Sequence, residues 1–135
     1  MRRAIKAATK AELAYQDAAR ALGCVVCRYR IEHGLQPRVA GQCGPTRIHH
    51  RNLGDLHGQR QLGQHAVVAL GDWHHQGITI PNVSAKGMYA VYGPSFQAQA
   101  REFRAWTADV LPGYGRGTEA WQLWQDELIN GARAA

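Results

Sequence analysis

Two stretches decide the fold: Thr46-Arg47-Ile48-His49-His50 and His65-Ala66-Val67-Val68-Ala69-Leu70-Gly71-Asp72-Trp73-His74-His75. The first is short with a β-branched centre and residues 65–70 are apolar, so each stretch predicts a strand. The residues between them, 51–63, are polar and contain glycine, which predicts a long loop. Asp72 can cap a short helix that carries the second histidine pair. The predicted order is strand, loop, strand, helix.

The segment before the strands predicts one helix and then irregular chain. Thr9-Lys10-Ala11-Glu12 has the form of a capping box, and Gly23 can end a helix over residues 10–22. Four residues recur on one face of this helix, namely Ala11, Ala14, Ala18 and Leu22. We interpret Cys24-Val25-Val26-Cys27 as a tight turn, and the glycines and prolines of residues 33–46 predict a loop.

The C-terminal third predicts helices that pack on the strands. Ser84 can cap a helix ending near Tyr92-Gly93, Pro94-Ser95 can open a second through about Trp106, and Thr118 can cap a third. We therefore expect an α+β protein with a single domain over residues 10–130. Its core should span about residues 22–80 and its helical part about residues 84–130, after a basic tail at residues 1–9.

Size and charge narrow the functional classes. The chain has 135 residues, of which 45% are hydrophobic, and contains neither a membrane-spanning apolar run nor a signal-peptide core, so we expect a cytoplasmic protein. The net charge is +6, and residues 1–60 hold 11 Lys and Arg against 4 Asp and Glu. This basic half is expected to face a polyanion such as DNA, although charge alone does not identify the partner.

The cysteines and histidines predict metal sites. Cys24 and Cys27 are separated by two residues, a spacing that suits metal binding in a reducing compartment. Successive side chains of a strand point to opposite faces, so His49 and His50 should have different roles. Neighbours on a helix point about 100° apart, so His74 and His75 can serve two different centres.

The sequence resembles the phage and prophage recombination-enhancement nucleases, a RecA-dependent branch of the HNH endonucleases. The resemblance covers roughly residues 10–130 and is carried by five blocks in order: Leu22-Gly23-Cys24-Val25-Val26-Cys27, Ile48-His49-His50-Arg51, Gly58-Gln59-Arg60, Trp73-His74-His75-Gln76-Gly77, and Tyr92-Gly93-Pro94-Ser95 followed by Phe103. It implies a ββα-metal (HNH) core with a zinc-stabilised N-terminal knuckle and additional packing helices. It also implies DNA as substrate, a RecA filament as a possible partner, and a phage or prophage gene in a bacterial host.

The resemblance implies a role for each histidine of the proposed active site. His49 would be a metal ligand where many relatives have Asp, His75 would be the second ligand, and His50 would be the general base that activates water. The ion would be Mg, Mn or Zn. His65 is the candidate for the residue that orients the base, with Gln64 and Asn52 as alternatives.

A structural zinc is the second expected centre. Cys24, Cys27 and His74 supply three of the four ligands that tetrahedral zinc requires. In relatives the fourth is a cysteine just before the helix, where this chain has Gly71. Cys43 or Asp72 could replace it, and the other interpretation of Cys43 is a plain buried thiol.

Three arginines flank the proposed site and could contact phosphates, namely Arg47, Arg51 and Arg60. Two other functions remain open. One is a zinc-stabilised DNA-binding or RecA-binding module without catalysis, which would not need His50. The other is a metal-storage or metal-sensing protein, which would have no affinity for nucleic acid.

Overall fold

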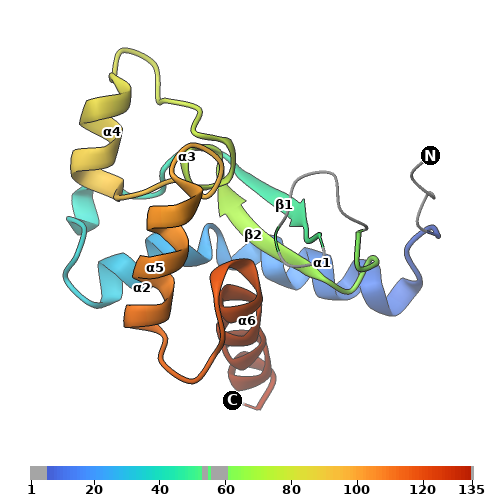
Figure 1. The fold of residues 1–135 in the computed structure, drawn as a ribbon. Helices are drawn as coiled ribbons and strands as arrows, with labels where there is room; N and C mark the ends of the chain where they lie inside the picture. The colour runs from blue at the N-terminus through green and yellow to red at the C-terminus, as the bar shows by residue number, and fades with distance from the viewer. Residues whose placement is uncertain (1–5, 53–54, 56–60, 135) are drawn as a thin grey trace.

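A computed structural model describes residues 6–52, 55 and 61–134, and has a mixed α+β fold (Figure 1). The elements in chain order are α1 (Lys10–Leu22), α2 (Val25–Glu32), the 3₁₀ turn η1 (Arg38–Ala40), β1 (Thr46–His50), β2 (Val67–Gly71), α3 (Asp72–Gln76), α4 (Ala85–Tyr92), α5 (Ala100–Val110) and α6 (Gly117–Ala134). The α+β class predicted from the sequence is confirmed.

The two strands and the short helix follow one another as the sequence predicts. β1 and β2 are antiparallel, with Ile48 opposite Ala69 and His49 opposite Val68. All five residues of β2 are buried, because helices cover both of its faces. β2 begins at Val67, two residues later than predicted. Asp72 is the first residue of α3 and Gly71 is its N-cap, so Asp72 does not cap this helix.

Helix α1 has the predicted ends and a different buried face. Thr9 and Glu12 form the capping box, and the chain leaves the helix at Gly23. The buried residues are Gln16 and Ala19, whereas the predicted face is exposed at its first two positions. The alanine spacing predicted the wrong buried face, because the side chain of Gln16 enters the interior and donates a hydrogen bond to the backbone oxygen of Gln64 at 2.8 Å.

The Cys-x-x-Cys segment is not the tight turn that we expected from the sequence. Cys24 is the N-cap of α2, and Cys27 lies in its first turn. Residues three apart on a helix share a face, so the two sulfur atoms face the same side without a chain reversal.

The C-terminal helices complete the core. Ser84 caps α4 through the backbone N–H of Gly87, as predicted. α5 begins at Ala100, several residues after the predicted start, because Phe96 first donates its N–H to the backbone oxygen of His74 at 2.9 Å. α6 begins at Gly117, and its Trp121 is buried against α5 with its indole N–H donating to Thr107.

One buried side chain attaches α6 to the sheet. Gln125 accepts the backbone N–H of Ala69 at 2.9 Å and donates to the backbone oxygen of Val67 at 3.0 Å. Both groups belong to the edge of β2 that faces away from β1. Gln125 therefore satisfies polar groups that would otherwise be buried without partners.

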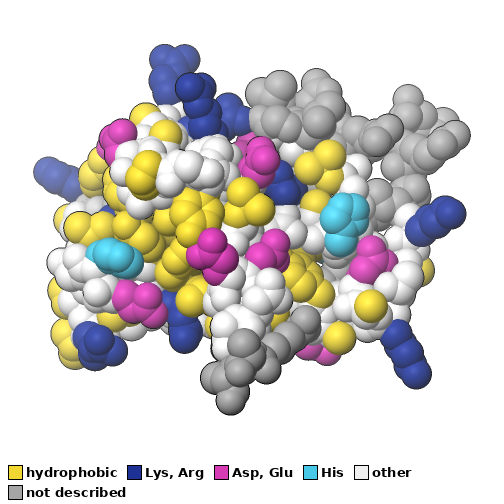
Figure 2. All heavy atoms as spheres, turned by 90° about the horizontal axis from the view of Figure 1, so that it is seen from below, with side chains coloured by type: hydrophobic (Ala, Val, Ile, Leu, Met, Phe, Trp, Pro, Cys, Tyr) yellow, Lys and Arg dark blue, Asp and Glu magenta, His cyan; other side chains and the backbone are white. Residues whose placement is uncertain are grey.

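The surface does not separate charge by sign on the face seen from below. Acidic side chains lie among apolar ones there, and most Lys and Arg side chains project near its rim (Figure 2). None of the described helices has the length and apolar character needed to cross a bilayer.

Candidate metal centres

Four buried side chains meet between α2, the loop before β1, and α3. Cys24, Cys27, Cys43 and His74 are each 0% exposed, and their ligand atoms all lie within 4.8 Å of one another. The His74 Nδ1 atom is 3.4 Å from the Cys24 sulfur and 3.5 Å from the Cys27 sulfur. The sulfur atoms of Cys24 and Cys43 are 3.9 Å apart. This buried Cys₃His group could hold a metal ion such as zinc.

The spacings match a tetrahedral centre. Ligands at Zn–S and Zn–N bond lengths of about 2.3 Å and about 2.0 Å stand roughly 3.8 Å apart for two sulfurs and roughly 3.5 Å for sulfur and nitrogen. The side chain of His74 is also fixed from behind, because its Nε2 lies 2.7 Å from the backbone oxygen of Tyr92. An N–H donated there leaves the Nδ1 lone pair directed at the sulfurs.

The protonation of this cluster opposes a cation at low pH. Burial raises the pKa of Cys24, but hydrogen bonds from Cys27 and Cys43 outweigh it, so this pKa is well below its ordinary value. Burial and the same thiolate raise the pKa of Cys27. Burial lowers the pKa of His74, but the Cys24 thiolate outweighs it and raises it to about 10. A bound cation must displace the protons of Cys27 and His74, so the affinity of the cluster for a cation decreases as the pH is lowered.

Gly71 explains how Cys43 joins the group. A Cβ atom built on Gly71 would lie only 2.4 Å from the Cys43 sulfur. Cys43 therefore occupies the space that a cysteine side chain at position 71 would fill. The other candidate, Asp72, is engaged elsewhere, because its carboxylate accepts a hydrogen bond from Arg47 at 3.1 Å.

A second cluster, formed by His49 and His75, lies on another side of α3. His49 of β1 and His75 of α3 approach to 3.1 Å between Nδ1 and Nε2. Two nitrogens about 2.1 Å from one ion stand roughly 3.0 to 3.4 Å apart, so the pair suits a shared cation. The consecutive residues His74 and His75 thus belong to two different clusters, as the helix geometry predicted.

Burial keeps both rings of this pair neutral. It lowers the pKa of His49 to about 3, and the neighbouring charges of His75 and His50 act in the same direction. Burial also lowers the pKa of His75, against the opposing charge of Asp72. A neutral imidazole is the form that binds a metal ion.

The replacement His49→Gln is expected to make stability less sensitive to acid. An unfolded histidine takes up a proton near pH 6.5, whereas folded His49 does so only near pH 3. Stability due to neutral His49 is therefore lost as the pH falls through this window, by at most about 1.4 kcal/mol per pH unit. Urea unfolding of parent and variant between about pH 6.5 and about pH 5 measures the difference, in which the shared acid sensitivity of the cysteines cancels. If the free energy of unfolding had the same dependence on pH in parent and variant, burial would not be lowering the pKa of His49.

His50 lies against Gln64, one of the two alternatives to His65. Its Nε2 is 3.0 Å from the side-chain oxygen of Gln64. The preferred candidate His65 is directed elsewhere, with its Nδ1 4.0 Å from a carboxylate oxygen of Glu12 and 72% of its side chain exposed. Gln64 and His65 both lie in the turn before β2. The third candidate, Asn52, lines the hollow beside His49.

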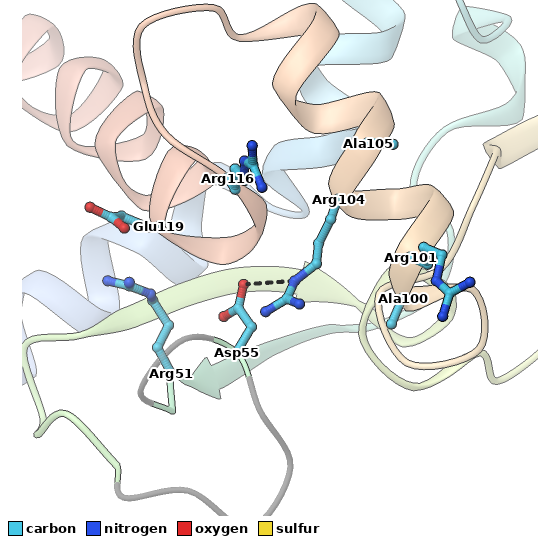
Figure 3. A pocket seen from close by; sticks show the side chains of 8 residues that line it. All are labelled: Arg51, Asp55, Ala100, Arg101, Arg104, Ala105, Arg116 and Glu119. Carbon is cyan, nitrogen blue, oxygen red and sulfur yellow. Dashed lines mark ion pairs between the residues drawn. The ribbon is translucent and has the colours of Figure 1, made fainter.

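His49 opens on a hollow of about 310 Å³, which a larger cavity of about 740 Å³ adjoins (Figure 3). The larger cavity is lined by Arg51, Asp55, Ala100, Arg101, Arg104, Ala105, Arg116 and Glu119. Of the two predicted arginines that the structure describes, Arg51 lies here and Arg47 does not. Arg47 is on β1 and pairs with Asp72, and Arg60 is outside the described residues. Arg101 and Arg104 were missed, although their spacing places both on one face of α5.

Comparison of the chain with protein-family models, with curated protein sequences and with solved structures found no match in any of the three.

Proposed function

We propose that this chain is a metal-dependent DNA endonuclease of the HNH type. The observation that carries the proposal is the 3.1 Å approach of His49 to His75, between a strand and the helix that follows its hairpin partner. Two neutral imidazoles at this spacing can hold one divalent cation. We propose that the Cys₃His group holds a structural zinc, and that the histidine pair holds a catalytic ion, Mg, Mn or Zn.

The bound ion would supply positive charge to the scissile phosphate and the leaving oxygen. His50 is the proposed general base. An N–H donated from its Nε2 to Gln64 leaves Nδ1 as the basic nitrogen, which can accept a proton from the attacking water. Because His49 and His50 point to opposite sides of β1, the phosphate must pass over the edge of this strand that does not face β2.

The proposed substrate is DNA and the proposed partner is a RecA filament, both from the family resemblance. A second candidate is a zinc-stabilised DNA-binding or RecA-binding module without catalysis. It is favoured by the separation of the two clusters, because the buried Cys₃His group contains none of the proposed catalytic residues. Its distinguishing property is strand binding that persists when no bond is cut.

Purified protein incubated with supercoiled plasmid is expected to nick it when Mg²⁺ or Mn²⁺ is present. A brief treatment with EDTA should remove the ion at the half-buried histidine pair, stop the reaction, and allow recovery on adding metal. Parallel reactions with a RecA filament test the partner. A control for histidine substitutions in this assay is His33→Gln, which changes an exposed histidine at the C-terminal end of α2. Absence of nicking under every condition would favour the binding module.

A further inference from the structure

The larger cavity is a basic pocket lined by α5, the start of α6 and the segment that follows β1. It holds four arginines and two acidic residues, an excess of two positive charges. Arg101 and Arg104 come from α5, Arg116 precedes α6, and Arg51 follows β1 (Figure 3). Arg101 and Arg116 are exposed, so their guanidinium groups are available to a ligand from solvent.

Internal contacts fix the two remaining arginines and one of the acids. Arg51 donates to the hydroxyl of Thr118 at 3.2 Å and to the side-chain oxygen of Gln122 at 2.6 Å. Asp55 accepts the backbone N–H of Thr118 at 2.9 Å, and its carboxylate lies 3.9 Å from Arg104. The side chain of Asp55 is only 6% exposed. Its charge is thus directed at the start of α6 and at Arg104, and only weakly at the solvent.

The basic cavity and the hollow beside His49 lie side by side. Three residues line both of them, namely Asp55, Ala100 and Arg104. A ligand can therefore extend from the His49–His75 pair, along the first turn of α5, to Arg116. We use the term arginine trough for this combined depression, with Arg51, Arg101, Arg104 and Arg116 as its basic residues.

We propose that the arginine trough binds consecutive backbone phosphates of the nucleic-acid strand whose neighbouring phosphate lies at the His49–His75 pair. The inference rests on the proposed nuclease function for the position of the cut bond, and on the trough alone for strand binding. An open trough lined by four arginines suits a chain of phosphates, because separate arginines can neutralise separate phosphates. The face shown in Figure 2 contrasts with it, since acidic side chains lie among apolar ones there and most Lys and Arg side chains project near the rim.

The test measures how the protein binds fluorescent oligothymidylate over a series of salt concentrations, with EDTA present only during the measurement to prevent cutting. The double variant Arg101→Ala/Arg116→Ala should bind a long strand at least about tenfold more weakly. Its slope of log affinity against log salt should fall by about 1.4, because each lost phosphate contact on a single strand removes about 0.7. Binding of a thymidine dinucleotide should not change.

The matched control is Arg20→Ala/Arg38→Ala, which removes the same charge from α1 and η1, elements that contribute no residue to the trough. Equal losses in both double variants would overturn the proposal, because only net charge would then matter. A nucleoside triphosphate that competes as strongly as a long strand would also overturn it, in favour of a small-molecule site.

The two proposals fail separately. If the parent protein nicks plasmid but the trough variant binds the long strand as tightly as the parent, the trough inference is wrong and the nuclease proposal stands. If no condition gives nicking but strand binding depends on Arg101 and Arg116, the trough inference stands as a strand-binding site and the nuclease proposal is wrong.

Discussion

Replacing His75 with alanine is expected to weaken binding of the proposed catalytic ion by more than about 100-fold, since even the loss of a group behind a metal ligand costs about 10-fold to 100-fold. Replacing His50 with alanine should leave that ion bound and lower the rate of plasmid nicking by about 100-fold to 10,000-fold, the usual contribution of a positioned general base. The two results differ because only His49 shares its nitrogen contact with His75, while His50 lies against Gln64.

Isothermal titration of Mn²⁺ into each variant, beside the nicking assay, separates ligand from base. Gln64→Ala should share part of the His50→Ala defect, because it removes the acceptor that orients the ring. His65→Ala provides the comparison, since this side chain is exposed toward Glu12. A His50→Ala variant that cuts as fast as the parent would exclude His50 as the base. A larger defect for His65→Ala than for Gln64→Ala would restore the first choice made from the sequence.

The variant Cys43→Ala is expected to lose zinc and to unfold at room temperature, and adding Gly71→Cys to it should restore both zinc and folding. Structural zinc contributes about 10–16 kcal/mol of apparent binding energy in small zinc domains, as much as the whole stability of a typical domain, about 5–15 kcal/mol. The rescue is expected because a Cβ atom at position 71 would lie only 2.4 Å from the present position of the Cys43 sulfur, so a cysteine side chain there can enter the space that Cys43→Ala vacates. Gly71 has φ −70°, which any residue can adopt.

Zinc content after dialysis and thermal unfolding followed by circular dichroism measure this rescue. The single variant Gly71→Cys is the control, and it should be less stable than the parent because its side chain collides with Cys43. If Cys43→Ala keeps its zinc, Cys43 is a plain buried thiol. If the double variant stays free of zinc while the single variant Gly71→Cys is as stable as the parent, the two positions do not share one ligand space.

The hairpin, α3 and the ends of α1 could be predicted because their signals are local. The alternation of a strand and the 100° step of a helix already separate His49 from His50 and His74 from His75. The choice between Cys43 and Asp72 could not be made from the sequence, because it depends on how a glycine-rich loop packs against the start of α3. The geometry places Cys43 in the group, with Asp72 held by Arg47.

The charge distribution was harder to predict for a similar reason. Residues 61–135 hold 5 Lys and Arg against 6 Asp and Glu, so a sum over that half predicts no basic surface. Folding nevertheless gathers Arg101, Arg104 and Arg116 beside Arg51 from the other half. Glu119 is the one acid of the same segment that lines this cavity, and the others lie elsewhere, such as Asp126 beside Tyr15. Summation along a sequence loses this separation in space.

The attachment of Gln125 to β2 has a consequence for the growing polypeptide on the ribosome. Chains emerge at about 5–20 residues per second, so β2 leaves the ribosome several seconds before the helix that satisfies its outer edge. During that interval the backbone groups of Val67 and Ala69 are open to pairing with another nascent chain. Tyr15 likewise lacks its hydrogen-bond partner Asp126 until 111 more residues have been synthesised. Completion of α6 is therefore the event that ends the period of greatest exposure to aggregation during synthesis.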